Sequence, residues 1–296
     1  MCVYESEDTE MTWILRFLLV AALGIQSAMA SDNGSLTLVV GFAPGGTSSV
    51  AARFIADSIE KVAGIKVIVE NRPGAGGSLA ANWVRRQVGT KTLFFMAGTS
   101  VPKIPPAPDL VPVALVATSK FVAVASKNAP ATLPEYLDAA RRNDLLRNVA
   151  TPGAGSVPHL IGEKLFRDAG MSMEHIPYQG ASPAILSVVS GHVSLAIVPY
   201  PDFVAFTDRL RVVAETGKEF EAEYWSGIFA PLGISEVEIQ RLAEIFRKAA
   251  SSERFREQLE KVGLQPTWKP AAELRRIHEK DWARWKPELE RLGIKP

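Results

Sequence analysis

The stretch LTLVVGFAPGGTSS, residues 36–49, joins a short apolar run to a turn of glycines and hydroxyl residues. The run 36–42 is rich in residues that favour strands, which predicts a buried β-strand. A helix is expected after the turn, over 48–62, because apolar residues recur there at three- to five-residue spacing: Val50, Phe54, Ile55, Ile59 and Val62. A strand, a glycine-rich turn and a helix in this order are typical of an α/β protein.

The same alternation continues along the chain. Further strands are expected over 66–70, 92–96, 113–118, 121–126, 193–198 and 210–214. Further helices are expected over 79–86, 133–141, 158–169, 183–190, 236–251, 254–262 and 271–292. Continuous apolar strands suit a sheet covered on both faces, so we predict an α/β fold with a largely parallel sheet. Trp282 and Trp285 share one face of the last helix and are expected to dock it.

The N-terminus has the features of an export leader. The apolar run 13–25 ends in Ala28-Met29-Ala30, which predicts cleavage near Ala30 and a signal peptide over 1–30, with Met11 a possible true start. An uncleaved membrane anchor is the alternative, but no cluster of Lys and Arg follows the run to stop transfer. The only cysteine, Cys2, lies before the expected cleavage site, so the remaining residues offer neither a disulfide nor a Cys metal ligand.

Residues 31–296 are numerous enough for two lobes. A chain that leaves one lobe, builds a second and returns would cross near 117–120 and again near 214–218. Lobe I is therefore expected over 31–118 and 215–296, and lobe II over 119–214. The 32 basic and 28 acidic residues of this part are too evenly dispersed to indicate nucleic acid. We expect a small-molecule partner.

The turn at 41–49 has the chemistry of an anion site. The first turn of a helix leaves N–H groups unpaired and carries partial positive charge. Gly45 and Gly46 allow close backbone approach, while the hydroxyls of Thr47, Ser48 and Ser49 can cap the helix or donate to a ligand. The turn lacks the Gly-Lys-Ser/Thr of a P-loop and the Gly-x-Gly-x-x-Gly of a dinucleotide site. An ordinary capped turn is the structural alternative.

Two further turns repeat this design. Residues 71–78, NRPGAGGS, precede the expected helix 79–86, and residues 151–159, TPGAGSVPH, open the helix 158–169. Arg72 suggests a carboxylate clamp, although a structural role in tying down the turn is favoured. Ligands gather at the carboxyl ends of strands in open α/β sheets. If the first two turns lie on one lobe and the third on the other, they face each other across a cleft.

Catalytic patterns are poor by comparison. Ser156 and His159 are three residues apart, but no Gly-x-Ser-x-Gly elbow surrounds the serine, and a hydroxyl at a helix N-terminus is usually a cap. His159, His175, His192 and His278 lack metal-site spacing. We therefore expect neither a metal nor another cofactor, and no enzymatic activity.

Several motifs together resemble the Bug/TctC-like solute receptors, the binding components of tripartite tricarboxylate transporters. The resemblance runs from Ser31 to the C-terminus. It is carried by 69–77 (VENRPGAGG), 44–46 (PGG), 151–159, 175–180 (HIPYQG), 190–193 (SGHV) and 293–296 (GIKP).

The resemblance implies a type II periplasmic-binding-protein fold, in which two hinged lobes clasp a carboxylic acid. It implies that loops 44–49 and 151–156 contact the carboxylate through backbone N–H groups, hydroxyls and bridging waters. It further implies a periplasmic monomer that delivers its ligand to inner-membrane transporter subunits. The expected ligand-binding set is Ala43, Gly45, Gly46, Thr47, Ser48, Ser49, Gly98, Thr99, Thr151, Gly153, Ala154, Gly155, Ser156, His159 and Tyr178.

The sequence departs from the family pattern in places that bear on the ligand. Ser49 stands where Asp is common, Ser187 and Ser194 replace acidic residues, and the loops at 100–109 and 215–223 lack the usual proline-containing segments. Loss of Asp at position 49 would remove negative charge from the helix mouth and favour a doubly charged anion over an amine.

The function predicted first is a periplasmic receptor that captures a small organic anion for transport. A sensory receptor that presents its closed form to a signalling partner is one alternative. A scaffold that has lost ligand binding is another. A hydrolase built on Ser156 and His159 is the least supported because neither an elbow nor an acid partner is evident.

Overall fold

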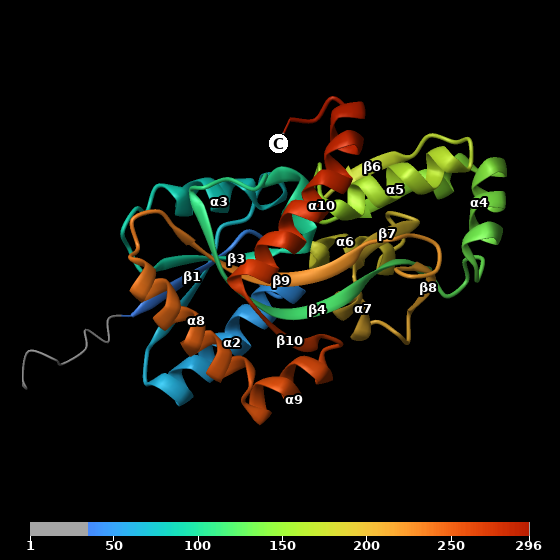
Figure 1. The fold of residues 1–296 in the computed structure, drawn as a ribbon. Helices are drawn as coiled ribbons and strands as arrows, with labels where there is room; N and C mark the ends of the chain where they lie inside the picture. Colours follow the sequence, from blue (N-terminus) through green and yellow to red (C-terminus); the bar gives the residue numbers. More distant parts are fainter. Residues whose placement is uncertain (1–34, 296) are drawn as a thin grey trace, which may run out of the picture. The chain divides into compact units, whose positions relative to one another are not determined.

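One long strand, β4 (Leu110–Ser126), joins the two halves of the sheet in this computed structural model, which describes residues 35–295. The predicted leader, its cleavage near Ala30 and the start at Met11 lie outside the described residues. The strand order is β2-β1-β3-β9-β4-β7-β5-β6, and β8 and β10 also pair with β4. Figure 1 shows β4 and β9 running between the two groups of helices.

The first half-sheet contains the strands that flank the first two predicted turns. Its strands besides β4 are β1 (Leu36–Val40), β2 (Val67–Asn71), β3 (Thr92–Ala97), β9 (Glu223–Pro231) and β10 (Gln265–Pro270). The second half-sheet contains β5 (Asn148–Thr151), β6 (Glu174–Pro177), β7 (Leu195–Pro199) and β8 (Leu210–Glu215).

The backbone changes partners in the middle of β4. Lys120 pairs with Glu223 of β9, whereas Phe121, the next residue, pairs with Pro199 of β7. The chain returns to the first half between β8, which ends at Glu215, and β9. We call Lys120–Phe121 and residues 216–222 the crossing region. The lobe boundaries given above remain a prediction, but the change of partners lies close to them.

The prediction of a largely parallel sheet is wrong. β1 pairs in parallel with β2 and β3, and β5 with β6 and β7, but every pairing made by β4 or β9 is antiparallel. β9 is antiparallel to β4 because β8 already runs antiparallel to the second part of β4, and residues 216–222 contain no helix that would reverse the chain, so β9 continues along the first part of β4 in the same direction. A second correction concerns the expected strands 113–118 and 121–126, which form one strand. The polar pair Ser119-Lys120 lies where β4 changes partners and not in a turn.

Four strands were absent from the prediction. β5 and β6 have four residues each, too few for a pattern, and β10 contains two prolines. Proline lacks the N–H of a ladder and is confined to strand edges and bulges; the pairing of β10 with β4 shifts register between Pro266 and Lys269. β9 carries Ser226 and Gly227 in its middle, although both are inside the protein.

The predicted helices are confirmed within two residues at their ends. They are α2 (Thr47–Ala63), α3 (Ser78–Arg85), α4 (Leu133–Arg142), α5 (Val157–Asp168), α6 (Ala181–Val189), α8 (Glu236–Ala250), α9 (Glu253–Lys261) and α10 (Ala271–Arg291). The short α7 (Tyr200–Val204) and the 3-10 turns η1 (Ala75–Gly77), η2 (Gly98–Lys103) and η3 (Asp144–Arg147) complete the order. Side-chain caps fix several starts, including Ser156 for α5 and Ser235 for α8.

Helix α10 connects the two halves. Trp285 is buried in the core and Trp282 packs against it, which confirms that this pair docks the helix. Trp225 of β9 donates to Asp281 over 2.8 Å. Farther along the helix, Glu288 accepts two hydrogen bonds, of 2.7 and 2.8 Å, from Arg167 of α5 in the second half. The helix thus contacts elements of both half-sheets.

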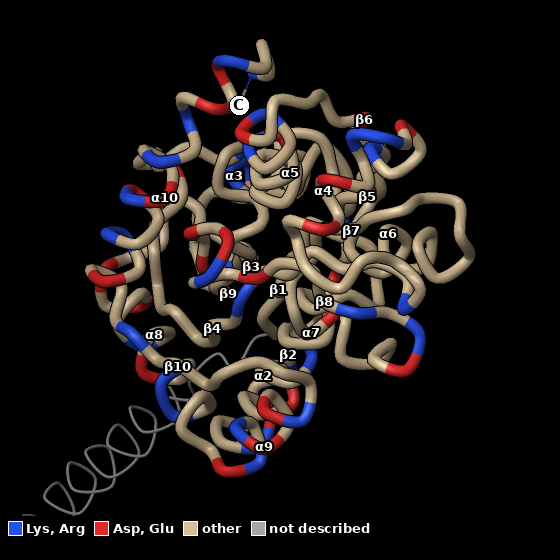
Figure 2. The backbone as a smooth tube through the Cα atoms, turned by 90° about the vertical axis from the view of Figure 1, so that its right-hand side faces the viewer, with Lys and Arg blue, Asp and Glu red and all other residues tan. Residues whose placement is uncertain are grey.

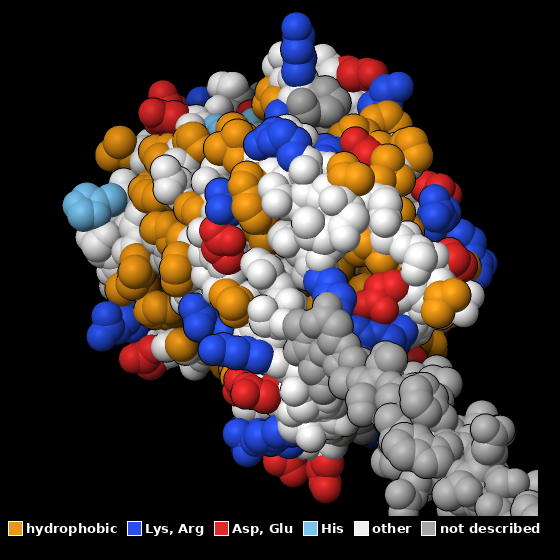
Figure 3. Space-filling view, turned by 90° about the vertical axis from the view of Figure 1, so that its left-hand side faces the viewer, with side chains coloured by type: hydrophobic (Ala, Val, Ile, Leu, Met, Phe, Trp, Pro, Cys, Tyr) orange, Lys and Arg blue, Asp and Glu red, His pale blue; other side chains and the backbone are white. Residues whose placement is uncertain are grey.

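Charges of both signs are interspersed on the surface. Figure 2 shows Lys and Arg alternating with Asp and Glu along α9 and α10, and Figure 3 shows the same mixture among apolar side chains on another face. No extended surface of one sign, of the kind that binds nucleic acid, appears on these faces of the described chain. Between residues 35 and 295, no helix combines the length and apolar character required to cross a bilayer.

Helix α8 offers a test of the core because one of its faces is buried and the other is exposed to solvent. Phe246 is 1% exposed, whereas Val237 on the same helix is 77% exposed. Phe246→Ala should lower the free energy of unfolding by about 3–5 kcal/mol, since a buried ring leaves a cavity. Val237→Ala should change it by less than about 0.5 kcal/mol. Denaturant unfolding of both variants measures this, and equal effects would contradict the assigned helix face.

Candidate functional site

The first predicted turn closes on a carboxylate from a distant part of the chain. Gly46 is the extended N-cap of α2, and the next residue, Thr47, meets Asp202 of α7. The Thr47 amide donates to Oδ1 of Asp202 over 2.9 Å, and the Thr47 hydroxyl donates to Oδ2 over 2.5 Å. A helix N-terminus stabilises negative charge through its unpaired N–H groups. Asp202 therefore lies where an external anion was predicted.

Burial makes the charged form of Asp202 costly. The side chain is 9% exposed, and burial raises the pKa of its carboxyl to about 6, although the hydrogen bonds from Thr47 act in the opposite direction. Sequence reasoning missed this residue because 155 positions separate it from Thr47. The available signal was an isolated acidic residue in the apolar stretch 195–206.

The hydroxyls of the two serines after Thr47 already have partners within the protein. Ser48 Oγ shares a 3.4 Å hydrogen bond with the hydroxyl of Tyr224, a fully buried residue of β9. Ser49 Oγ donates to Oδ1 of Asn71 over 3.3 Å. Asn71 in turn donates to the carbonyl of Phe42 over 2.8 Å. Ser49 thus ties the first turn to β2. The negative charge at the mouth of α2 comes from Asp202, not from position 49.

Turn η2 contributes a polar atom that lacks a partner. Thr99 is 2% exposed, and its Oγ1 makes no hydrogen bond within the described structure. A buried hydroxyl without a partner is unfavourable, which makes this atom a candidate ligand contact. Gly98 has a structural role, since a Cβ there would lie 3.1–3.2 Å from the backbone nitrogen and indole of Trp225.

The third turn is held by two stacked imidazoles. The rings of His159 and His175 stack with centroids 3.6 Å apart. His159 Nδ1 accepts from the Gly155 amide over 3.0 Å, and His175 Nε2 shares a 2.7 Å hydrogen bond with Thr151 Oγ1. Burial lowers the pKa of His159 to about 4; burial, followed by the charge of His159, lowers that of His175 to about 3. Both rings are therefore neutral at pH 7.

Ser156 has the structural role of a helix cap. Its Oγ accepts from the His159 amide over 3.4 Å, and the side chain is fully buried. The His159 ring is engaged by the Gly155 amide on one nitrogen and lies 3.5 Å from Glu163 on the other. Neither ring nitrogen is hydrogen-bonded to Ser156, so the geometry lends no support to a serine nucleophile.

The three predicted turns meet, but through backbone rather than across an open cleft. A Cβ on Gly41 would lie 2.7 Å from Cα of Gly77, and one on Gly76 would lie 3.3 Å from the carbonyl oxygen of Ala154. These positions need glycine because no side chain fits between the turns. The amide of Ala43 donates to the carbonyl of Gln179 over 3.1 Å, a further contact between the half-sheets.

Arg72 and Tyr178 have structural contacts at the edges of this junction. Arg72 pairs with Glu70 at 2.6 Å and its guanidinium lies 3.8 Å above the ring of Trp83, as expected for a structural role. The amide of Tyr178 donates to the carbonyl of Thr151 over 2.9 Å, which fixes the 175–180 segment beside the third turn.

The space left between the turns is very small. A cavity of about 20 Å³ has room for roughly one water molecule. Its walls are Phe42, Gly46, Thr47, Ser48, Thr99, Pro152, Ala181, Pro199 and Asp202. Four predicted site residues line it, namely Gly46, Thr47, Ser48 and Thr99. The structure does not place the other predicted residues on this wall: Ala43, Gly45, Ser49, Gly98, Thr151, Gly153, Ala154, Gly155, Ser156, His159 and Tyr178.

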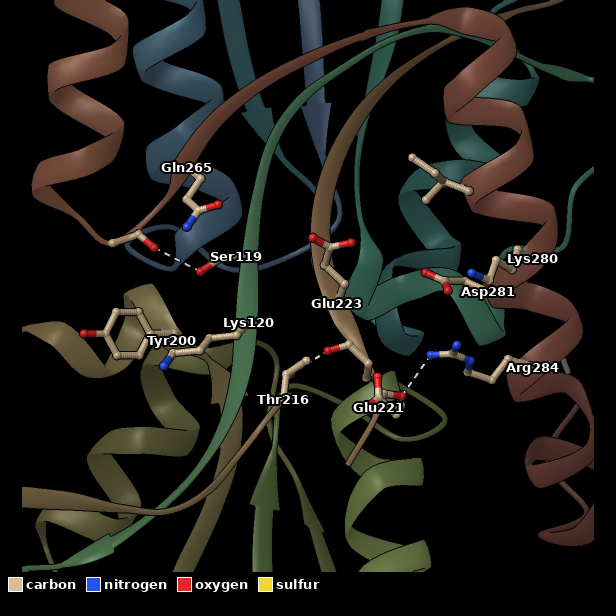
Figure 4. Close-up of a pocket in the computed structure, with 13 residues that line it drawn as sticks. Ser119, Lys120, Tyr200, Thr216, Glu221, Glu223, Gln265, Lys280, Asp281 and Arg284 are labelled. Atoms are coloured by element: carbon tan, nitrogen blue, oxygen red, sulfur yellow. Dashed lines mark hydrogen bonds between the residues drawn. The ribbon is translucent and has the colours of Figure 1, made fainter. Parts of the chain in front are cut away.

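A much larger cavity of about 610 Å³ lies at the crossing region (Figure 4). Cations and carboxylates alternate on its walls, and several are already engaged: Lys120 pairs with Glu215, and Arg284 donates to the carbonyl of Glu221 over 2.9 Å. Burial, followed by the nearby charge of Asp281, raises the pKa of Glu223. The labelled lining residues are Ser119, Lys120, Tyr200, Thr216, Glu221, Glu223, Gln265, Lys280, Asp281 and Arg284. None of them belongs to the predicted ligand set.

The stacked histidines make stability depend on pH. Because folding lowers the pKa of His175 from its ordinary 6.5 to about 3, the unfolded chain binds the proton more readily. The stability contributed by the neutral ring is complete above about pH 6.5 and is lost as the pH falls toward 3. His175→Gln keeps a polar partner for Thr151 but cannot ionise. Its melting temperature should therefore fall less between pH 7 and pH 4.5 than that of the wild type.

The exposed His192 provides the matched control for this measurement. In thermal unfolding of both variants, His192→Gln should show the same fall in melting temperature between pH 7 and pH 4.5 as the wild type. A loss of melting temperature in His175→Gln as large as that of the wild type would show that His175 is not the titrating group.

Comparisons with known proteins agree with the motifs. The family described as "Tripartite tricarboxylate transporter family receptor" matches residues 51–211 and 204–294. The UPF0065 protein in the gbd 5' region of Cupriavidus necator is 26% identical over 93% of this chain and 94% of its own length.

Solved structures share the fold. The periplasmic binding protein BugD has a TM-score of 0.81 at 22% identity, covering 88% of this chain and 98% of BugD. MatC from Rhodopseudomonas palustris, solved with bound malate, has a TM-score of 0.79 at 24% identity, covering 86% of this chain and 99% of MatC. The fold is the two-lobed α/β architecture of periplasmic binding proteins. The chain belongs to the receptor family of tripartite tricarboxylate transporters.

Proposed function

We propose that the chain captures a small organic carboxylate at the N-terminus of α2 and delivers it to the membrane subunits of a tripartite transporter. The observation that carries this proposal is the bond between Thr47 and Asp202, because it places a carboxylate on the amide and hydroxyl of the first turn. A site that accommodates an internal carboxylate in this way has the stereochemistry to hold an external one. MatC, which shares the fold, was solved with malate, an organic carboxylate.

Ligand entry requires the turns to separate. A cavity of about 20 Å³ cannot hold a carboxylic acid, so the described conformation is closed around the site. The turns come from different half-sheets, which are joined through β4 and the return to β9. Rotation about the crossing region would move the third turn away from the first. A ligand that contacts both turns would then stabilise the closed form, so binding and closure are one equilibrium.

The predicted site residues are proposed to have different roles in binding. Gly46, Thr47, Ser48 and Thr99 line the closed cavity and are proposed as primary contacts. Thr151, Gly153, Ala154 and Gly155 belong to the third turn, which is proposed to move away from the first turn when the site opens. Ser156 and His159 maintain that turn through the cap and the Gly155 contact. Capture is proposed to occur in the periplasm, after removal of the leader near Ala30.

Position 46 tests the proposal directly. A Cβ at Gly46 would lie 3.4 Å from Oδ1 of Asp202 and 3.5 Å from Ser182 Oγ, so alanine fits while the branched side chain of valine enters the carboxylate position. The backbone φ of −81° is open to any residue, so the fold should survive. Gly46→Val should abolish the thermal stabilisation produced by carboxylates that stabilise the wild type, and Gly46→Ala should retain part of it.

The assay is a thermal-shift screen of the leaderless protein against mono-, di- and tricarboxylates and amino acids. Circular dichroism would establish that both variants are folded. Undiminished carboxylate binding by Gly46→Val would place the ligand elsewhere.

A further inference from the structure

Asp202 lies on the walls of two neighbouring spaces. On one side is the cavity of about 20 Å³ between the turns. On the other is a pocket of about 320 Å³ bounded by the start of α2, by α6 and α7, and by Val262. Thr47 and Asp202 belong to the walls of both spaces. Withdrawal of the Asp202 side chain would therefore join the amide of Thr47 to the larger pocket.

The larger pocket is predominantly apolar. Its walls include Val50, Ile185, Leu186, Pro201, Phe206 and Val262, and Asp202 is the only ionisable side chain among its lining residues. A second carboxylate of a ligand would find no cation on these walls, and burying an unpaired charge is costly. Moving a hydrocarbon tail from water onto these apolar walls is favourable. The pocket thus favours a ligand with a single charged end.

The polar end of such a ligand would meet a set of donors that is already present. Thr47 offers its amide and hydroxyl, both now bonded to Asp202. Thr99 lines the same small cavity, and its buried Oγ1 has no partner in the described structure. An incoming carboxylate could accept from all three donors, whereas Asp202 leaves the Thr99 hydroxyl unused.

We propose that Asp202 is a displaceable stand-in for the ligand's carboxylate, and that the ligand is a monocarboxylate whose apolar tail lies in the pocket along α6. This inference rests on the proposed function. Two carboxylates cannot share Thr47, because they would compete for one amide and repel each other. Asp202 lies on the five-residue α7, directly after Pro201, and its release is proposed to involve a local change of this short helix. In the ligand-free protein it keeps the site occupied and lowers the apparent affinity.

Variants at position 202 distinguish a competitor from a ligand contact. Isothermal titration at pH 8 would use hexanoate as the probe, with adipate, malate and hexylamine for comparison. Asp202→Ala should strengthen hexanoate binding at least tenfold because the internal competitor is gone. Asp202→Asn keeps an acceptor for the Thr47 amide but removes the charge. Its affinity for hexanoate should therefore lie between those of Asp202→Ala and the wild type. In each protein, hexanoate should bind more tightly than adipate, which has the same number of carbons and a second carboxylate.

The tail is tested at an exposed wall residue. Leu186 is 51% exposed, so Leu186→Glu should fold, yet it places a charge beside the proposed tail and should weaken hexanoate binding at least tenfold. Leu145, which is 72% exposed and outside the pocket, provides the matched control; Leu145→Glu should leave affinity unchanged.

The outcomes separate this inference from the proposed function. Tight binding of malate or adipate that Asp202→Ala weakens or leaves unchanged would overturn the stand-in while leaving the carboxylate receptor intact. Binding of hexylamine that is lost in both variants at position 202 would make Asp202 a cation partner and overturn the inference. No binding of any carboxylate to wild type or variants would overturn both proposals.

Discussion

The backbone hydrogen bonds of β4 are the constraint on which the rest of the structure depends. One continuous strand pairs with β9 and β10 on one side of Lys120 and with β7 and β8 on the other. Each half-sheet needs this strand because backbone N–H and C=O groups buried in the core must be paired. The two halves are therefore joined at a fixed register, and helix α10 contacts both of them. This arrangement brings glycine-rich turns from both halves to one junction, where a small change in angle alters the space between them.

Within that junction, the conflict between charge and burial determines what the site can hold. The N-terminus of α2 favours a carboxylate, but the surrounding side chains are largely apolar, and the buried charge of Asp202 has few partners besides Thr47. The pKa of Asp202 is raised because burial disfavours its charged form. A receptor must bind tightly enough to capture its ligand and release it again. Under the proposal above, a buried internal carboxylate would meet both needs, because it would preserve the geometry of the site and still be displaceable.

The sequence determined the local elements more fully than their arrangement. The apolar stripe of α2, with Ile55 and Ile59 buried, and the turn residues around Gly46 were visible as patterns of spacing and composition. The antiparallel return of β9 was not, because Ser226 and Gly227 interrupt its apolar pattern while tertiary packing buries both. The pairing of Asp202 with Thr47 could not be foreseen, since no local rule links residues on different half-sheets. Motif resemblance identified the family, but the residue closing the site lies outside those motifs.

The contact between Arg167 of α5 and Glu288 of α10 links the state of the receptor to the medium around it. Helix α10 packs against β4 and η2 of the first half and reaches the second half at this ion pair. Moving α5 away from α10 would separate a guanidinium from a carboxylate, and both charges are partly accessible to solvent. Dissolved ions screen that attraction over about 10 Å at 0.1 M salt. In the proposed opening of the receptor, the ionic strength of the medium would therefore enter the balance between open and closed forms, independently of how much ligand is present.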